Sequence, residues 1–247
     1  MKRLLLSLLI IPGLLSVSTV RAQSDDFGMW YELGAEKKLS RKWSVSAEGE
    51  LRTRNNTRTI DRWSLGVGAE YKILKGLKAS AGYIMLNNNN HEEMDLKKDG
   101  LSYNKWTPSY WGVSHRFNLS LTGSVDWNRF SFSLRERWQY TYRPEAEGKK
   151  YDFDEETWKA VKGKGKNVLR SRAEVSYDIP HWKFDPFVNV EMFNGNSGIQ
   201  KMRYQLGVDY KYMKKHAFAL TYRFQNVNND DSEVDSHLIG LSYKYKF

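Results

Sequence analysis

The stretch WSLGVGAEYKI, residues 63 to 73, alternates strictly between apolar and polar positions. Its odd-numbered residues are Trp, Leu, Val, Ala, Tyr and Ile, whereas its even-numbered residues are Ser, Gly, Gly, Glu and Lys. Successive side chains of a β-strand point to opposite faces, so this period of two predicts a strand with one apolar and one polar face. The same alternation recurs at 43–52, 77–85, 201–212 and 218–225, and the chain is therefore predicted to be all-β.

A water-soluble sandwich would also alternate, so length, polarity and aromatic content have to separate the two classes. The alternating segments approach the length of strands that cross a bilayer at a tilt, with lipid on one face and a polar lumen on the other. Tyrosine and tryptophan gather near the predicted strand ends, where membrane barrels place aromatic girdles. The mean hydropathy of −0.69 argues against membrane helices, and only helices or closed barrels satisfy every backbone polar group in lipid. We therefore predict a transmembrane antiparallel up-and-down β-barrel of about 10–12 strands.

The N-terminus has the features of a secretory signal peptide. Two basic residues, Lys2 and Arg3, precede an apolar run at 4–15, and a cleavage site with small residues follows. The run is shorter than the roughly 20 residues that a membrane helix needs, so a retained anchor is the less favoured alternative. We predict a signal peptide at 1–22, a single barrel domain at 23–247, and location in the cell outer membrane.

Composition excludes several classes of site and partner. The chain has no cysteine, which excludes disulfides, thiol nucleophiles, thiolate metal ligands and a lipidated N-terminal cysteine. Its formal net charge is +10, but the basic residues are spread along alternating segments and form no single stripe. An exported protein of this kind is expected to meet outer-membrane lipid and lipopolysaccharide, not nucleic acid. No cofactor and no metal are predicted, and the oligomeric state is left open.

Short and long connections alternate along the predicted barrel. Short links at 74–76, 180–183 and 213–216 alternate with longer polar loops at 53–59, 87–108, 144–166, 195–199 and 226–235. In membrane barrels the short turns face the periplasm and the long loops face outward. Counting back from Phe247 gives ten strands that start near Trp43. An eleventh candidate, 27–38, breaks the even count, so it closes the barrel in parallel, lies inside the lumen, or belongs to a twelve-stranded barrel.

The polar face of the predicted strands is rich in charge, and basic residues outnumber acidic ones. The favoured interpretation is a ladder of ion pairs that plugs a narrow lumen, because barrels of about eight strands are filled by side chains and open channels need about 16 to 18. The alternative is a tight conduit that prefers anions, because surplus arginines in a low-dielectric wall attract negative solutes. The residues expected to line the lumen are Glu48, Glu50, Arg52, Arg62, Glu70, Lys72, Arg116, Arg135, Arg137, Arg170, Arg172, Glu174, Glu191, Arg203, Asp209 and Arg223.

Glu136 departs from this pattern. The phase of Phe132, Leu134 and Trp138 would turn its carboxylate toward lipid. A β-bulge, or a position at the level of the lipid headgroups, is expected here in preference to a functional carboxylate.

A barrel enzyme that modifies lipids would need a nucleophile and a histidine base on adjacent strands. His115 follows Ser114 and His237 follows Ser236, but adjacent residues of a strand point to opposite faces, so neither pair can form a dyad. The sequence also lacks a Gly-x-Ser-x-Gly nucleophile elbow. We therefore predict a non-enzymatic protein, with a lipid-modifying enzyme as the lesser alternative.

Two charged segments lie in the loop at 144–166. YDFDEE, residues 151–156, gathers four carboxylates but lacks the glycine of a calcium-binding loop, so the surrounding loop is expected to be solvated and self-neutralising. KGKGK, residues 162–166, is expected to be a flexible basic tip that contacts lipopolysaccharide phosphate or nothing specific.

The C-terminal stretch HLIGLSYKYKF, residues 237–247, also alternates and ends in phenylalanine. Its residues Tyr243, Tyr245 and Phe247 resemble the signal by which the barrel assembly machinery recognises outer-membrane barrels. Between residue 61 and the C-terminus stand the stretches DRWSLGVGAEYKI, HRFNLSL, SLRERWQYTYRP, YDIPHWKFDPFVNVEMFN, RYQLGVDYKY and GLSYKYKF. Together these phrases resemble the family catalogued as domain of unknown function 2490, within the outer-membrane barrel superfamily. The resemblance implies a fold and a location, and it supplies no catalytic residue because the family has no established activity.

These observations favour an outer-membrane barrel of unknown cargo, with a plugged lumen and a structural or surface-interaction role. The alternatives are a narrow anion-preferring pore and a lipid-modifying enzyme.

Overall fold

The computed structural model describes residues 25–213, 215–228 and 234–247 of the 247-residue chain. The predicted signal peptide at 1–22 lies outside these residues. Every helix or strand assigned in the described part is a β-strand, which confirms the all-β class. Among the same residues, no helix has the length and apolar character needed to cross a membrane.

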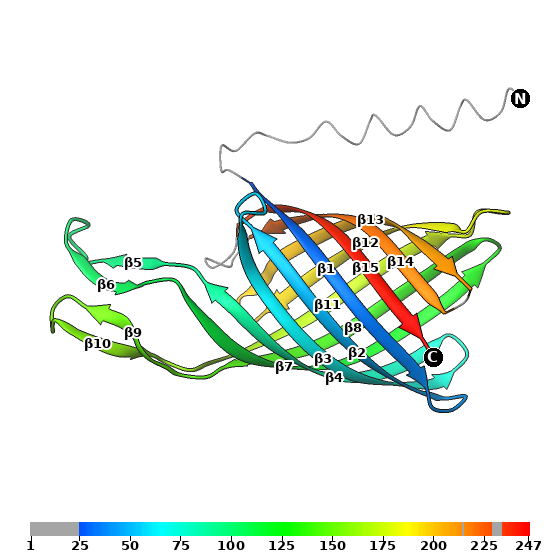
Figure 1. Cartoon of the computed structure of the whole chain (residues 1–247), viewed down its shortest axis with the longest axis horizontal. Helices are drawn as coiled ribbons and strands as arrows, with labels where there is room; N and C mark the ends of the chain where they lie inside the picture. Colours follow the sequence, from blue (N-terminus) through cyan, green and yellow to red (C-terminus); the bar gives the residue numbers. More distant parts are fainter. Residues whose placement is uncertain (1–24, 214, 229–233) are drawn as a thin grey trace, which may run out of the picture.

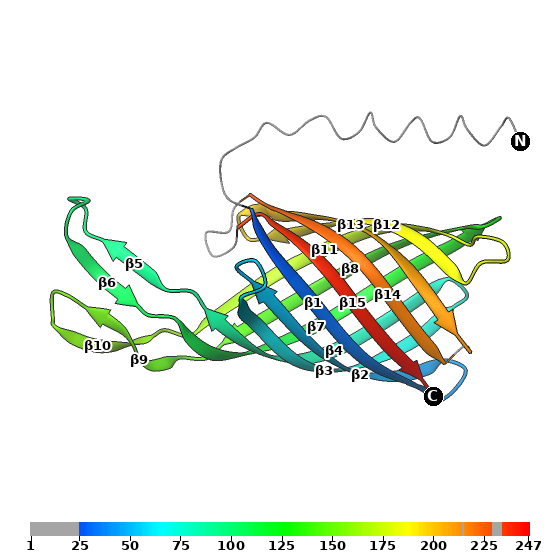
Figure 2. The same ribbon diagram turned by 45° about the horizontal axis from the view of Figure 1, so that its top comes forward.

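Eleven of the described strands close into a barrel whose strands run obliquely to its long axis (Figures 1 and 2). Neighbouring strands are hydrogen-bonded in the order β1-β15-β14-β13-β12-β11-β8-β7-β4-β3-β2. The predicted barrel is therefore confirmed. Its strands are β1 (Asp26–Lys38), β2 (Trp43–Arg54), β3 (Thr59–Leu74), β4 (Leu77–Asn90), β7 (Tyr110–Trp127), β8 (Phe130–Arg143), β11 (Lys164–Tyr177), β12 (Phe184–Gly195), β13 (Gly198–Tyr212), β14 (His216–Val227) and β15 (Ser236–Lys246).

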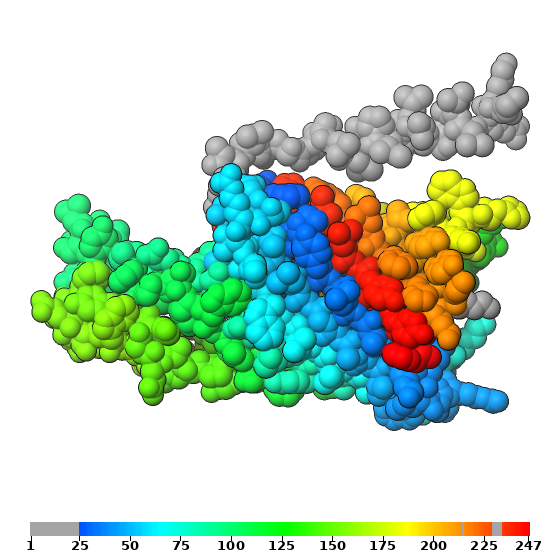
Figure 3. Space-filling view, in the orientation of Figure 1, coloured from blue at the N-terminus to red at the C-terminus, as the bar shows by residue number. Residues whose placement is uncertain are grey.

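The first and last strands join in parallel to close the barrel. β1 pairs antiparallel with β2 and parallel with β15, where Tyr31 lies opposite Leu241. An odd number of strands that otherwise run up and down forces the first and last to point the same way. Figure 3 shows β1 and β15, in blue and red, side by side along the wall. Of the three alternatives for residues 27–38, parallel closure is correct, and the ten-strand count from Trp43 was one strand short.

The two faces of the wall invert the usual arrangement of a soluble protein. Leu65 and Val67 on the outer face of β3 are 56% and 60% exposed, whereas Ser64 on the inner face is 6% exposed. The same phase runs through the neighbouring strands, where Leu119 and Leu206 are exposed and Asn118 is buried. An apolar outer wall around a polar interior is the pattern of a membrane barrel.

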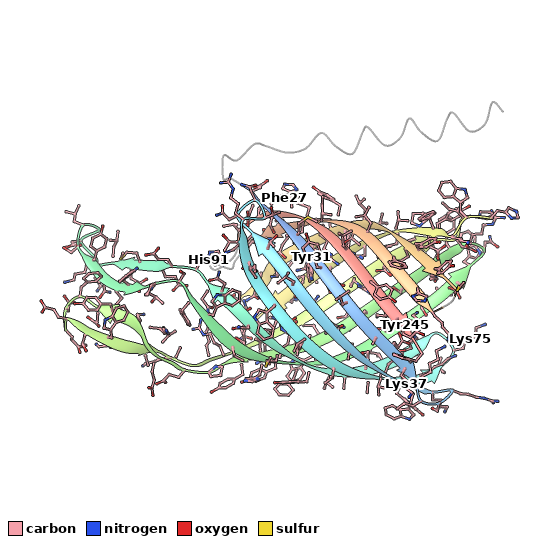
Figure 4. All side chains as sticks on the ribbon, viewed as in Figure 1. Phe27, Tyr31, Lys37, Lys75, His91 and Tyr245 are labelled. Atoms are coloured by element: carbon pink, nitrogen blue, oxygen red, sulfur yellow. The ribbon has the colours of Figure 1, made fainter. Side chains whose placement is uncertain are left out.

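The connections differ at the two ends of the barrel. Figure 4 places Lys37, Lys75 and Tyr245 near the end with the short turns, and Phe27 at the other end. The turn beside Lys75 needs glycine, because Gly76 has φ +82° and an added Cβ would press on the carbonyl oxygen of Ser124. The short turns therefore lie together, away from the longest connections.

The two longest connections contain strands that the sequence did not indicate. β5 (Glu93–Leu96) and β6 (Tyr103–Thr107) form one hairpin, and β9 (Ala146–Asp152) and β10 (Thr157–Val161) form another. β6 pairs with β9, so the hairpins merge into a four-stranded sheet, order β10-β9-β6-β5, which we call the projecting sheet. It stands beyond the barrel at the end opposite the short turns (Figures 1 and 3). The expectation of plain polar loops here was therefore wrong.

The projecting sheet has two different faces. Cross-strand pairing aligns Met94 with Trp106, Trp106 with Tyr151, and Tyr151 with Trp158, so these four side chains form one row on the same face. The other face is charged and held by ion pairs, such as the 2.9 Å contact between Lys159 Nζ and Asp152 Oδ2. Alternation in strands this short was hidden by the many charges around them.

The basic segment at 162–166 also lies elsewhere than expected. Lys164 begins β11 and pairs with Arg143 of β8, so the segment stands at the base of the second hairpin. The turn at residues 153–156 forms the tip of that hairpin. The predicted basic tip is therefore wrong.

We expect Leu33→Pro to destabilise the barrel by roughly 2 kcal/mol or more, because proline removes a backbone donor from a strand that is paired on both sides. The matched control is Lys98→Pro. Lys98 is the second residue of a turn closed by a 2.9 Å bond from Gly100 N to Lys97 O, a position that favours proline. Urea unfolding in micelles, followed by tryptophan fluorescence, checks both. Equal midpoints for the two variants would contradict the role of the parallel seam.

The turn at the tip of the first hairpin is held by a carboxylate. Asp99 accepts hydrogen bonds from the backbone N–H groups of Leu101 and Ser102 and from the Ser102 hydroxyl, at 2.8 to 3.0 Å. These donors stabilise the ionised form and lower the pKa of Asp99 to about 2. Its contribution to the turn is therefore complete above the ordinary value near 4 and is lost as the pH falls through about 2.

An NMR titration of the Asp99 carboxyl should give this lowered pKa. In Ser102→Ala, which removes one of the three donors, the pKa should rise part of the way to its ordinary value. An unchanged pKa in the variant would show that the side-chain hydroxyl does not contribute.

Candidate functional site

Glu191 is the hub of a buried charge cluster inside the barrel. It lies on β12, is 3% exposed, and pairs with arginines from three other strands. The carboxylate accepts from Arg135 at 2.6 Å, from Arg170 at 2.9 and 3.0 Å, and from Arg203 at 3.4 Å. Because Arg135 is on β8 and Arg203 is on β13, one carboxylate joins strands on both sides of its own.

Trp30 of β1 fills the interior next to this hub. Its side chain is 6% exposed, and the indole N–H donates to Glu50 Oε2 at 2.6 Å. The guanidinium carbons of Arg52, Arg223 and Arg203 lie 3.4, 4.0 and 5.2 Å from the ring centroid. Cations over the face of a desolvated tryptophan are attracted to its π-system. Trp30 therefore keeps arginines from three strands together where simple repulsion would separate them.

These contacts cross the interior of the barrel. Arg203 on β13 reaches Trp30 on β1, although β14 and β15 stand between these strands in the wall. Phe193 adds a second ring, 4.5 Å from Arg170 and 4.9 Å from Arg203. We call this set the arginine layer; its members are Trp30, Glu50, Arg52, Arg116, Arg135, Arg137, Arg170, Glu191, Phe193, Arg203 and Arg223.

Arginines outnumber carboxylates in the arginine layer. Hydroxyl oxygens accept from two of them: Arg116 Nε donates to Thr141 Oγ1 at 3.1 Å, and Arg137 Nε donates to Ser120 Oγ at 2.9 Å. Among the described residues, the buried Nε atoms of Arg135, Arg170 and Arg203 find no hydrogen-bond partner. The layer therefore carries surplus positive charge and some donors still available to an acceptor.

The other residues expected in the lumen lie around this layer or nearer the short turns. Arg62 donates to Asn88 at 2.6 Å, and Arg172 lies 3.6 Å from Glu174, which accepts from Asn189. Glu70 pairs with Lys78 at 2.9 Å, and both side chains are more than 40% exposed. Glu48, Lys72 and Asp209 complete the set; the first two are exposed and Asp209 is partly buried.

Sequence reasoning missed Trp30 and Phe193, which together hold the layer. Both were passed over because large aromatic residues were assigned to the outer wall. Their positions in the alternating pattern could have revealed them. Trp30 lies between Met29 and Tyr31, which belong to the outer face, so it points inward. Phe193 is separated by even numbers of residues from the inward-facing Asn189 and Glu191. Phase was thus a better guide than residue type.

Glu136 lies on the outer wall without the expected bulge. The pairing of β8 with β7 and with β11 continues through it in unbroken register, opposite Leu121 and Ser171. Its Oε2 accepts a hydrogen bond from the Ser171 hydroxyl at 2.7 Å. Of the two alternatives expected at this position, the bulge is therefore wrong, and the carboxyl faces outward on a regular strand.

The histidines and serines are placed as strand geometry requires. His115 on the outer face contacts the Tyr83 hydroxyl at 2.8 Å, while Ser114 is buried on the inner face. His237 contacts the Tyr222 hydroxyl at 2.6 Å and Asp25 at 3.1 Å, while Ser236 is buried. Neither adjacent pair forms a dyad. Within the described residues, no group of three or more His, Cys, Asp or Glu is placed to hold a metal ion.

Two hollows in the barrel surface lie mainly on the outer wall. One is lined by small residues such as Ala47, Ala69 and Ala81, together with Tyr83 and Phe117. The other is lined mainly by aliphatic and aromatic side chains of β1, β12, β13, β14 and β15. In a bilayer such apolar hollows are filled by acyl chains, so the arginine layer is the stronger candidate for a functional site.

We expect Glu191→Gln to destabilise the barrel by about 3–5 kcal/mol, because buried guanidiniums would lose their shared carboxylate. The matched control is Glu70→Gln, which breaks an exposed pair with Lys78 and should cost less than about 1 kcal/mol. Urea unfolding of both variants in the same micelles checks this. Equal losses would show that the hub is no more important than a surface ion pair.

Comparisons with known proteins support the fold. The beta domain of the Bordetella autotransporter Brka is 12% identical, with 81% of this chain and 79% of that chain covered and a TM-score of 0.52. A NanC porin structure, also 12% identical, gives a TM-score of 0.48 over 85% of this chain and 93% of that one. A porin refined at 1.8 Å gives 0.36 at 12% identity, over 78% and 56% of the chains. Of these, the autotransporter domain supports the fold, and at 12% identity it supports the fold alone.

No curated protein matches the chain. A family model does, over residues 27–236, which include almost all of the barrel and the whole projecting sheet. The resemblance noted in the sequence is thereby confirmed, and the chain belongs to the family described as "Protein of unknown function (DUF2490)".

Proposed function

We propose that the protein is an outer-membrane β-barrel whose lumen is closed by the arginine layer, and that its role is structural or one of surface interaction, without catalytic turnover. The inverted arrangement of the wall supports the membrane location, because Leu65 and Val67 are exposed where lipid would cover them. The long connections would then face outward and the short turns the periplasm.

The contact between Trp30 and arginines of β2, β13 and β14 carries the proposal of a closed lumen. A solute passing this level would have to displace the indole ring and the guanidiniums around it. Removing one partner from a buried, paired charge cluster is costly, so the layer resists opening. Arg223 also forms an ion pair with Glu32 of β1 at 3.3 Å, which links the cluster to the first strand of the parallel pair.

The projecting sheet supports a role at the cell surface. Tyr103 and Trp158 are 54% and 49% exposed, and Phe153 packs between Tyr103 and Tyr151 with ring centroids 5.7 and 5.2 Å apart. Aromatic residues are enriched where proteins contact partners, since they offer large and rigid contact area. In this proposal the barrel is an anchor that displays the sheet among lipopolysaccharide chains.

Recognition by the barrel assembly machinery is part of the same proposal. The end of the chain is tied to β1, because Phe247 N donates to Glu36 O at 2.8 Å. The rings of Tyr245 and Phe247 meet edge to face at 4.7 Å, and Phe247 is 67% exposed. Alternating aromatic side chains therefore remain accessible on the last strand, together with Tyr243.

A second candidate function is a narrow pore that prefers anions. The observation that favours it is the surplus of arginine in the layer, with the buried Nε donors of Arg135, Arg170 and Arg203 available to an acceptor. An anion that reached the layer would gain charge-assisted hydrogen bonds there. In this alternative, movement of the Trp30 side chain would open the path.

Single-channel conductance of the refolded protein in a planar bilayer tests the proposal. The wild type should insert and stay silent, whereas Trp30→Ala should show discrete anion-preferring steps, because the layer loses its central ring and keeps its arginines. The matched control is Trp111→Ala on the outer wall, which should stay silent.

Steady anion-preferring steps in the wild type, reduced by Arg135→Gln and Arg137→Gln, would overturn closure and support the pore. Silence of Trp30→Ala in a barrel that has inserted would show that this residue does not close the lumen.

A further inference from the structure

Glu136 is an ionisable residue on the part of the outer wall that lipid would cover. Along the outer face of β8 it lies between Leu134, which is 56% exposed, and Trp138, which is 43% exposed. Phe130 and Phe132 follow toward the short turns, and Tyr140 and Tyr142 follow toward the other end. The carboxyl therefore stands between the two aromatic bands of this strand. Ionisable residues at such depth are rare and mark functional sites.

Within one chain, Glu136 accepts one side-chain hydrogen bond, from Ser171 of β11. A carboxyl that carries its proton has one O–H donor besides its acceptor oxygens. Oε2 already accepts from the Ser171 hydroxyl, which leaves the O–H on Oε1 directed away from that contact. In lipid a donor without an acceptor is costly, because no water is present to replace it. Within the described residues, the Glu136 O–H therefore lacks an acceptor, while the hydroxyl oxygen of Ser171 can still accept a hydrogen bond.

The surroundings of this pair suit close contact with another protein surface. The register continues from Ser171 to Met192 of β12 and Met202 of β13, so two flexible methionines extend the same row. Methionine is common at interfaces because it adapts to a partner's shape. Ala173, two positions from Ser171 on the same face, is small and exposed. Gly123 of β7 lies opposite Leu134, and the space where its Cβ would stand is open. Small residues let membrane segments approach closely.

We propose that this wall, formed by β7, β8 and β11, is the interface of a homodimer in which two copies are related by a two-fold axis. The Glu136–Ser171 pair is self-complementary: the O–H of each Glu136 donates to the partner's Ser171, while each Ser171 donates to its own Glu136. Four hydrogen bonds then close in a ring, and all four hydroxyl donors are satisfied. A two-fold interface uses the same patch on both copies, as this exchange requires. The inference rests on the membrane location proposed above.

Single cysteines test the interface directly, because the chain has no cysteine of its own. Leu134→Cys and Ala173→Cys lie next to the pair, opposite each other on β8 and β11 and two positions nearer the short turns. The matched control is Leu33→Cys on β1, which is 66% exposed and on the far side of the barrel. After refolding into phospholipid nanodiscs or vesicles and mild oxidation, at least one of the two variants next to the pair should form disulfide-linked dimers. The control should not.

A second pair of variants separates the hydrogen bonds from apolar packing. Glu136→Leu in the background of each of these two variants should reduce dimer formation on the order of tenfold, since both exchanged hydrogen bonds are lost. Glu136→Gln should retain it, because the amide both donates and accepts. Native mass spectrometry of the cysteine-free forms gives the same comparison without cross-linking.

A wild type that is monomeric from nanodiscs, or a Glu136→Leu variant as dimeric as the wild type, would overturn the interface. Insertion is measured separately, by the change in gel mobility of the folded barrel on heating. A chain that folds but does not enter lipid would refute the membrane location, and the dimer with it. An inserted monomer would leave the location standing and show that lipid alone covers Glu136.

Discussion

The closed ring of backbone hydrogen bonds is the constraint on which the rest of the structure depends. A wall surrounded by lipid cannot leave a strand edge unpaired, so every strand must have a neighbour on both sides. With eleven strands, this condition can be met only if β1 and β15 run parallel. Closure also fixes which side chains face inward, because each strand presents alternate residues to the interior. The charge of the interior is therefore a consequence of the phase set by the wall.

Inside the ring, one glutamate and two aromatic rings organise many arginines. Glu191 neutralises part of the charge, and the faces of Trp30 and Phe193 attract guanidiniums such as those of Arg223 and Arg170. A wall of eleven strands encloses a lumen narrow enough for such side chains to meet across it. In the proposed function, side chains of the wall itself close the lumen, and the described part of the chain has no separate plug domain.

The fold was largely predictable because the period-two pattern is strong in long strands such as β3 and β13. Phase also predicted that Glu191 and Arg203 point inward, and both side chains are buried in the structure. The parallel pairing of β1 with β15 was one of three alternatives that the sequence left open. Alternation in β1 could not decide between them, because the alternation does not depend on which strand β1 pairs with. The four strands of the projecting sheet were missed because they are short and rich in charge, and pairing between two distant hairpins leaves no local signal. Contacts across the lumen, such as Trp30 with Arg203, depend on barrel curvature that a sequence does not display.

The parallel seam also has a kinetic consequence. In every other neighbouring pair of the wall, the two barrel strands follow each other along the chain and are joined by a connection. β1 and β15 are instead the first and last barrel strands, and Asp26 lies opposite Ser236. This pairing has the largest sequence separation in the wall, so it loses the most chain entropy and is expected to form last. Until it forms, β1 presents an open edge that is a template for unwanted pairing. The barrel is therefore most prone to aggregation in the period before β15 pairs with β1.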